Sequence, residues 1–418
     1  MKAPHPIRAF LAVALLAAVP VAMAAPPAAA AVQAQTIYQG NAFGTLTATG
    51  TAVKSGRSAN IVLGCRTTAG REVTNRVLDE QLPGVFSAGQ VDTSLQALKS
   101  DSAQTSRSVA RTKDLDLFGG RIQAQAVQAK SASIRSLNDG AFHLSGAGSS
   151  LTGLVIDGNP QSGSPDPNTR IDLPNIGYVV LNEQTPRLTP TTAALGINMI
   201  HVHVTKTPNP TGLPSGSELI VSHAMSRLDR AAGPLGGTAY GSTMSVGDKV
   251  ASGPSYPVYQ ACVGTGGAIR TNSGSGQSVP DRYSAGSITN TVQGTVNTTK
   301  AVGETKSKIH NANVLTGQIL ADMITADSHA SKTASGKTFS DAGSGFGGLV
   351  VQGHPEIGDS VQPNTQVDLP IGTVWFHRVI QTDNSIEVHM IEVIVGDAVP
   401  GLPAGTHIVM GVARSTVR

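Results

Sequence analysis

The sequence predicts a mainly β protein made of two tandem homologous β-sandwich-like domains packed together. Three observations support this fold class. The 418-residue chain contains 47 Gly and 24 Pro but only 4% aromatic residues, which is typical of many short strands joined by turns. Short apolar runs and alternating segments recur along the chain. Most of the sequence is also present twice, at an offset of about 190 residues.

The first 24 residues have the pattern of a secretory signal peptide. Lys2 and Arg8 supply a positively charged start, residues 10–19 form an apolar run, and residues 22–24 (Ala-Met-Ala) match a small-residue cleavage site. We therefore expect a secreted protein, either extracellular or loosely associated with the cell wall. No later apolar run is long enough to span a membrane, so no membrane span is expected after signal removal.

Composition and charge narrow the class further. Residues 25–37 are rich in Ala and Pro and are expected to be disordered. Removing Lys2 and Arg8 takes the 30 basic residues to 28, against 27 acidic residues, so the mature chain is nearly neutral. A chain this long with so little net charge is not expected to bind nucleic acid. Two Cys residues cannot form a dense disulfide scaffold.

The internal duplication sets the domain boundaries. Residues 38–228 match residues 235–418, and residues 229–234 are expected to be the linker. The matched blocks are 41–45 and 238–242, 86–89 and 283–286, 120–122 and 317–319, 153–160 and 348–355, 167–174 and 363–370, and 212–216 and 401–405. The repeated turn and strand residues in the clearest blocks are Asp157, Gly158, Asn168, Asp172 and Pro174 in the first copy and Gly353, Asn364, Asp368 and Pro370 in the second.

Strands are the expected elements of each copy. Short apolar runs bounded by turn residues occur at 61–63, 154–156, 178–181 and 219–221. Residues 120–131 and 198–204 alternate, which places their apolar and polar side chains on opposite faces of a strand. Residues 78–114 and their counterpart 275–311 are the least regular, and either a strand pair or a short helix is compatible with them.

These blocks also resemble a known family. The stretch TGLVIDG…PNTRIDLPNIGYVVLNEQ within residues 151–184, followed by GLPSG near residue 212, is similar to the choice-of-anchor P family of secreted actinobacterial surface proteins. Ala239-Tyr240-Gly241 resembles the early AYG motif of that family. The resemblance implies secretion and attachment to a cell surface, but it implies no catalytic residues. The chain departs from the family in lacking a recognisable anchor, and it has Ser131, Ser133 and residues 224–226 where members often carry Cys.

The two cysteines, Cys65 and Cys262, occupy equivalent points of the two copies. An isolated pair in an exported chain usually forms a disulfide, and this pair would join the two repeats. The alternative is two buried free thiols that remain from a family bridge whose partners were lost.

His201 and His203 have the spacing that places two imidazoles on one strand face, and His223 is a third candidate ligand for a metal ion. The second copy has Met390 and Glu392 at the expected equivalent places and Val412 in place of His223, so hydrogen-bonded strand histidines are the preferred interpretation. No metal or other cofactor is therefore expected.

Asp157, Asp166 and Asp172 lie in a loop rich in Gly, Pro and Asn, as carboxylates that hold Ca²⁺ do. The second copy keeps Asp368 but has Gln352 in place of Asp157, and neither copy has EF-hand spacing. Stabilisation of turns by aspartate is the better interpretation.

The functional expectation is a non-enzymatic binding or adhesive protein of the cell envelope or extracellular matrix, with a cell-wall polymer or a surface protein as its partner. The alternative is a secreted polymer hydrolase with its site at the interface of the two repeats. Self-association through the edges of long, weakly charged strands is a further expectation. Trp375, the single Trp, is expected to fill a core strand.

Overall fold

The computed structural model describes residues 32–49, 52–247, 249–398 and 402–418. Throughout these ranges the regular elements are β-strands, and the strands form four antiparallel sheets. The mainly β fold of two repeated sandwich-like units is thus confirmed. The expected signal peptide lies outside the described residues. The described part of the chain contains no helix long and apolar enough to cross a membrane.

The first unit is a sandwich of two sheets. The first sheet has the strand order β12 (Thr169–Leu173), β13 (Gly177–Thr189), β14 (Thr192–Val204), β15 (Ser217–Ala231), β1 (Gln35–Thr49) and β2 (Ala52–Ser55), with β3 (Ile61–Arg66) also paired to β1. The second sheet has the order β11 (Asn159–Pro160), β10 (Val155–Ile156), β7 (Ile122–Ser136), β6 (Ala103–Leu117), β5 (Phe86–Lys99) and β4 (Arg71–Leu82), with β8 (Phe142–Ser145) and β9 (Ser150–Thr152) also paired to β7.

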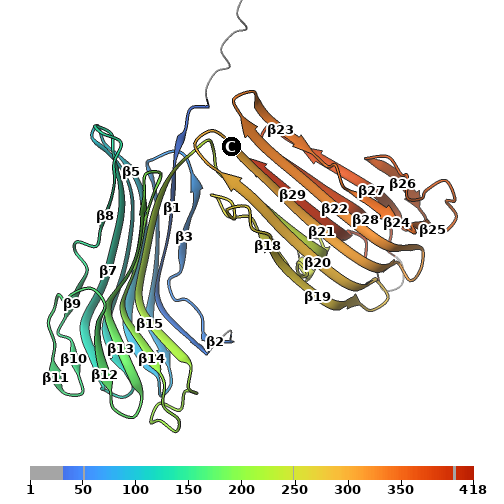
Figure 1. The fold of residues 1–418 in the computed structure, drawn as a ribbon. Coiled ribbons are helices and arrows are strands. Elements are labelled where there is room, and N and C mark those ends of the chain that lie inside the picture. Colours follow the sequence, from blue (N-terminus) through green and yellow to red (C-terminus); the bar gives the residue numbers. More distant parts are fainter. Residues whose placement is uncertain (1–31, 50–51, 248, 399–401) are drawn as a thin grey trace, which may run out of the picture.

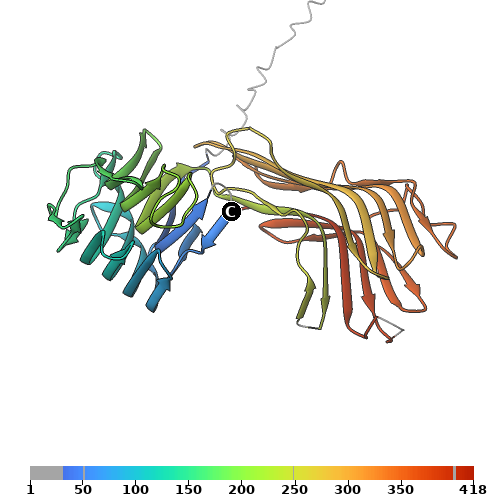
Figure 2. The same ribbon diagram turned by 90° about the horizontal axis from the view of Figure 1, so that it is seen from below.

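The second unit repeats this plan. The third sheet has the order β17 (Lys249–Ser252), β16 (Leu235–Val246), β29 (Thr406–Val417), β28 (Ser385–Val395), β27 (Gly372–Gln381) and β26 (Thr365–Leu369), with β18 (Val258–Tyr259) paired to β16. The fourth sheet has the order β19 (Arg270–Val279), β20 (Tyr283–Val296), β21 (Ala301–Val314), β22 (Ile319–Thr333) and β23 (Gly336–Ser340), with β24 (Gly345–Gly347) and β25 (Val350–Val351) also on β22. Figures 1 and 2 show the two sandwiches side by side, meeting at one end near the C-terminus.

Alternation of side chains explains how each sandwich closes. Along β14, Leu195, Ile197, Val202 and Val204 point inward and are almost fully buried, while Asn198 and His203 point outward. The same period-two pattern on the facing sheet supplies the other half of the core. Each unit buries its own apolar cluster, as a domain requires.

A line of unpaired residues crosses each sheet at matching positions, and the strands keep the same register on both sides of it. In the first sheet it runs through Asn182, Met199, Ser222 and Gly44, none of which pairs in the ladders on either side. The third sheet has the line His377, Met390, Gly411 and Gly241. Asn182, Ser222, His377 and Gly411 all have positive φ, a conformation that bends a strand locally. The two lines establish which residues of the repeats are structurally equivalent.

The structure corrects the expected boundaries and content of three segments. β1 begins at Gln35 rather than after residue 37, because Gln35 and Ile37 pair with Ala231 and Asp229 and the Ile37 side chain is buried. The expected linker is shorter, since β15 continues to Ala231 and β16 starts at Leu235. Residues 78–114 hold strands and no helix.

Trp375 is not a core residue. It lies half-buried on the outer face of β27, while its neighbours Val374 and Phe376 fill the core. The Arg378 guanidinium stands over its ring, 5.0 Å from the ring centroid. The alternation of side chains along β27 therefore places the Trp375 indole on the outer face, where the Arg378 guanidinium covers it.

Candidate binding site at the junction of the repeats

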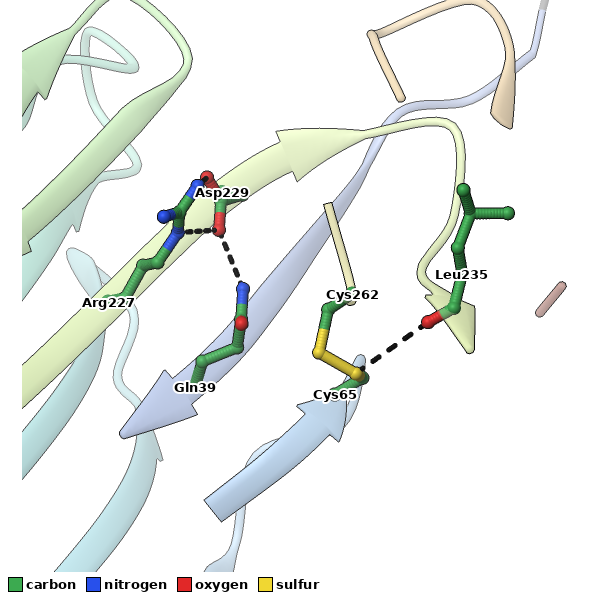
Figure 3. Close-up of a disulfide and its surroundings, with 6 residues drawn as sticks. All are labelled: Gln39, Cys65, Arg227, Asp229, Leu235 and Cys262. Carbon is green, nitrogen blue, oxygen red and sulfur yellow. Dashed lines mark hydrogen bonds and ion pairs between the residues drawn. A yellow bond between two sulfur atoms is a disulfide. The ribbon is translucent and has the colours of Figure 1, made fainter. Parts of the chain in front are cut away.

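A disulfide joins the two repeats. Cys65, at the end of β3, and Cys262, just after β18, have Cα atoms 5.5 Å apart, and the described part of the chain has no free cysteine. The two residues are separated by 197 positions but follow equivalent strands of the two units. Figure 3 shows the bond beside Leu235, the first residue of β16.

Backbone hydrogen bonds hold the connection between the units close to the disulfide. The Leu235 amide donates to the Cys262 carbonyl at 2.9 Å, and the Ala232 amide donates to the Asn297 carbonyl at 2.7 Å. Leu235 and Ala232 are buried. A Cβ on Gly233 would lie 1.9 Å from the Arg418 carbonyl oxygen, so only glycine fits there. The connection is therefore a packed segment rather than a free tether.

A cleft of about 550 Å³ lies beside this connection. Residues from both units line it, including the ends of β13 and β15 and the loop that follows Cys262. Four of its lining residues are arginines: Arg187, Arg227, Arg230 and Arg270. Its one lining carboxylate among the described residues is Asp229.

Asp229 neutralises only one of these arginines. Arg227 donates two hydrogen bonds to its carboxylate, at 2.7 and 2.9 Å, and Gln39 and Thr192 donate to it at 2.8 Å each. The carboxylate is 3% exposed, so it is fully engaged and removed from solvent. Figure 3 shows the Gln39–Asp229–Arg227 part of this network beside the disulfide.

The other three arginines of the cleft are exposed, and within the described residues none forms an ion pair. Burial and the nearby Arg230 guanidinium lower the pKa of Arg135, which indicates positive potential around Arg230. Two arginines come from β13 and β15 of the first unit, and Arg270 comes from β19 of the second. The junction therefore brings uncompensated positive charge from both repeats into one cleft.

A smaller cavity of about 460 Å³ includes Cys65 in its lining. It is lined by Arg66, Arg71 and Arg418, together with apolar residues such as Val62 and Leu235. Guanidinium groups are well suited to phosphate and carboxylate, because their planar array of donors matches two oxygens at once. The chemistry available at the junction is thus recognition of anions.

The repeated turn and strand residues have structural roles. Asn168 and Asn364 both have positive φ, and their side-chain oxygens accept hydrogen bonds from the backbone amides of Gln184 and Val379, at 2.9 and 2.8 Å. Gly158 and Gly353 also have positive φ. These residues fix the same turns in both units.

The aspartates of the candidate Ca²⁺ loop are engaged separately. Asp157 accepts two hydrogen bonds from Arg121, at 2.6 and 2.8 Å, and Arg121 also donates to the Pro174 carbonyl at 3.0 Å. Asp172 pairs with Arg170 at 3.0 Å, and Asp368 accepts from Thr373 at 3.1 Å. The third aspartate of the loop, Asp166, accepts a hydrogen bond from Thr169 through its backbone carbonyl at 2.7 Å. Asp157 and Asp172 therefore have separate partners, which stabilise turns and strand ends.

The strand histidines need a corrected alignment. His201 pairs with Val180 and Ile220 across its sheet, and Glu392 pairs with Trp375 and Val409. Counting from the two lines of unpaired residues makes Glu392 the equivalent of His201 and Ile394 the equivalent of His203, rather than Met390 and Glu392. Val412 remains the equivalent of His223.

His223 is not part of a common metal site with the other two histidines. Its Nδ1 is 2.6 Å from Asn198 Oδ1, and it donates there because the Asn198 amide nitrogen donates to Glu183. Its Nε2 is 3.0 Å from the side-chain amide of Asn41, from whose N–H group a neutral ring accepts a hydrogen bond. Burial and the nearby Arg57 lower the pKa of His223 to about 4. His223 is therefore a neutral, hydrogen-bonded strand residue.

Comparison with known proteins assigns the chain to no family. None of the models of known protein families matches the chain, and no curated protein is similar to it. The argument for function therefore depends on the site alone. Sequence reasoning identified the two cysteines but missed the arginines, because they come from separate segments and the net charge of the chain conceals them.

Proposed function

We propose that this chain is an exported, non-enzymatic binding protein of the cell envelope or extracellular matrix, of the choice-of-anchor P kind. Its ligand is an anionic polymer that carries phosphate or carboxylate groups. The observation that carries the proposal is the junction cleft, where Arg187, Arg230 and Arg270 gather without ion-pair partners among the described residues.

Three features favour a polymer over a small ligand. The cleft is lined by residues of both units, so an extended chain that lies along the junction can contact the arginines of each. A second cavity that also contains arginines lies on the Cys65 side of the disulfide. The mature chain as a whole is nearly neutral, so the positive charge that attracts an anionic polymer is a local feature of the junction.

A hydrolase at this junction has less support. Glycosidases need two suitably placed carboxyl groups, one of which shuttles a proton. Within the described lining of the cleft, Asp229 is the single carboxylate, and Arg227, Gln39 and Thr192 occupy its oxygens. That carboxylate serves to hold Arg227 in place.

The test is binding of the secreted chain to immobilised anionic polymers, with polyphosphate and polyglutamate as probes and neutral dextran as reference. We expect saturable binding that weakens as salt rises, because each arginine contact competes with counterions. The double variant Arg187→Ala/Arg270→Ala should lose at least tenfold in affinity. Arg282→Ala, at the remote turn between β19 and β20, removes the same kind of charge and serves as the matched control.

Two outcomes would overturn the proposal. One is binding that is equal on neutral and anionic polymers. The other is release of soluble fragments from the polymer by purified protein, with loss of that release in the double variant, which would establish the hydrolase instead.

A further inference from the structure

A second polar cluster lies on the outer face of the first sheet, far from the junction. It consists of Glu183 on β13, His201 and His203 on β14, and Glu218 on β15. Glu218 is near the start of β15, at the opposite end of that strand from Arg227 and Arg230. The proposed polymer-binding function uses none of these four side chains.

His201 has the surroundings of a metal ligand. Its Nδ1 lies 2.7 Å from Glu183 Oε2, and Asn198 donates to the same oxygen at 2.6 Å. A carboxylate on Nδ1 holds the proton there and leaves the Nε2 lone pair available, as in the carboxylate–histidine pairs that support metal ions. The residue is 7% exposed, and its Nε2 is buried without a hydrogen-bond partner.

The free nitrogen faces further donor atoms. His201 Nε2 is 3.7 Å from Glu218 Oε2, and His203 Nδ1 is 3.6 Å from Glu218 Oε1. These separations are too long for good hydrogen bonds, but two ligands of a tetrahedral zinc ion lie about 3.4 Å apart when their bonds are about 2.1 Å. Glu183, His201 and His203 place donor atoms within 4.8 Å of one another, and Glu218 is the further carboxylate that faces both imidazoles.

The cluster has two acids but no cation of its own. Glu183 and Glu218 are the acids, and both lie beside the two histidines. Arg170 lies over the Tyr178 ring that stacks on His203, but its ion pair is with Asp172.

In the second repeat, positively charged side chains lie at the positions equivalent to those of the two glutamates. There Arg378 stands at the position of Glu183, Glu392 at that of His201, and His407 at that of Glu218. Arg378 and His407 each lie 2.8 Å from Glu392 Oε1. The positive charge that the second repeat supplies with side chains is missing from the first.

Another carboxylate–histidine group shows the same contrast. Glu304, Asp327 and His329 also place donor atoms within 4.8 Å of one another. The Lys306 ammonium lies 3.0 Å from Glu304 and 2.8 Å from Asp327, so a side chain already supplies the cation. Among these clusters, the one around His201 is therefore the candidate for a bound ion.

We propose that His201 Nε2, His203 Nδ1 and the Glu218 carboxylate bind one Zn²⁺ ion, with Glu183 positioning His201. Two imidazoles and one carboxylate are a ligand set that zinc favours, and a water molecule completes the tetrahedron. The site stiffens the end of the first sheet, because it ties β14 to β15 at the point where the loop between them leaves the sheet.

Zinc binding is measured by isothermal titration calorimetry and equilibrium dialysis on the tag-free, disulfide-bonded chain. We expect one Zn²⁺ per chain and a rise in Tm on loading. His203→Asn and Glu218→Gln, at partly exposed positions, should each weaken binding at least tenfold. Glu183→Gln should weaken it tenfold to a hundredfold, as loss of a carboxylate that supports a ligand does.

His143→Asn is the matched control, because His143 is exposed on β8 and lies outside the cluster. It should bind zinc as the parent chain does. The proposal fails if no saturable site is found at millimolar zinc, or if His203→Asn and Glu218→Gln retain the parent affinity while remaining folded by circular dichroism. Polymer binding at the junction is measured separately and is expected to be unaffected by these variants.

Discussion

At the scale of the residue, Asn168 connects the most recognisable sequence motif to a defined turn. Its φ of 61° and its bond to the Gln184 amide both suit asparagine, which tolerates the left-handed region and carries a short acceptor. Asn168→Ala should lower the free energy of unfolding by about 1–2 kcal/mol, while Asn168→Gly, which restores the backbone freedom, should lower it less. Urea denaturation measures both, with the exposed Asn138→Ala as control; equal effects of the Ala and Gly changes would contradict the backbone part of the argument.

His389 gives the second repeat a defined pH dependence. Burial opposes its charge, but hydrogen bonds to Glu387 and Glu392, at 2.9 Å each, raise the pKa of His389 to about 9. A group whose pKa rises on folding stabilises fully below its unfolded value, so this contribution is complete below about pH 6.5 and is lost as the pH rises through about 9. It amounts to roughly 3 kcal/mol. Thermal unfolding from pH 6 to 10 should show the fall, and His389→Gln should flatten it; an unchanged slope in that variant would exclude His389 as the source.

At the scale of the element, hydrogen bonds between buried hydroxyl groups join the facing sheets. Ser226 on β15 lies 2.7 Å from Ser131 Oγ and 2.9 Å from Ser133 Oγ on β7, and all three side chains are buried. Ser328 and Ser415 repeat the contact at 3.0 Å in the second unit. The serines at the positions where the family resemblance suggests cysteines therefore meet across the sandwich.

Removing the shared hydroxyl should destabilise the first unit. Ser131 retains its bond to the Leu195 carbonyl, but Ser133 loses the side-chain partner that the structure gives it. Ser226→Ala should lower the free energy of unfolding by about 1–3 kcal/mol, because a buried hydroxyl is left unsatisfied. The exposed Ser164→Ala should change it by less than about 0.5 kcal/mol. Equal urea midpoints for the two variants would show that these hydroxyl contacts contribute nothing to stability.

The elements themselves could be predicted from sequence to different extents. Alternation identified strands such as β7 and β14, because one side of each is buried against the facing sheet. The lines of unpaired residues could not be predicted, since Asn182, Met199 and Ser222 look like ordinary strand residues. Without those lines the sequence aligns His201 with Met390 instead of Glu392, which hides the replacement of Glu183 and Glu218 by Arg378 and His407.

At the scale of the whole molecule, the duplication in the sequence predicted both the two repeated sandwich-like units and the matched cysteines. Both follow from comparing the copies position by position. The arginine cleft did not follow from that comparison. Arg187, Arg227 and Arg230 come from β13 and β15, which flank β14 in the first sheet. Arg270 is distant in sequence and joins them because the connection between the units is short and packed. A site assembled at the contact of two repeats leaves no local pattern in the sequence of either repeat.

The last prediction concerns the bond that holds this contact. Each sandwich has its own core, so the double variant Cys65→Ser/Cys262→Ser should keep the circular dichroism of a folded β protein. The units then remain covalently joined only through residues 232–234, where we expect faster proteolysis. We also expect at least tenfold weaker binding of polyphosphate, because Arg187 and Arg270 are no longer held in one cleft. A reductant should have the same effect on the parent chain and none on the double variant. Alkylation of two thiols in the unreduced native protein, or full polymer binding by the double variant, would contradict a cleft that depends on this disulfide.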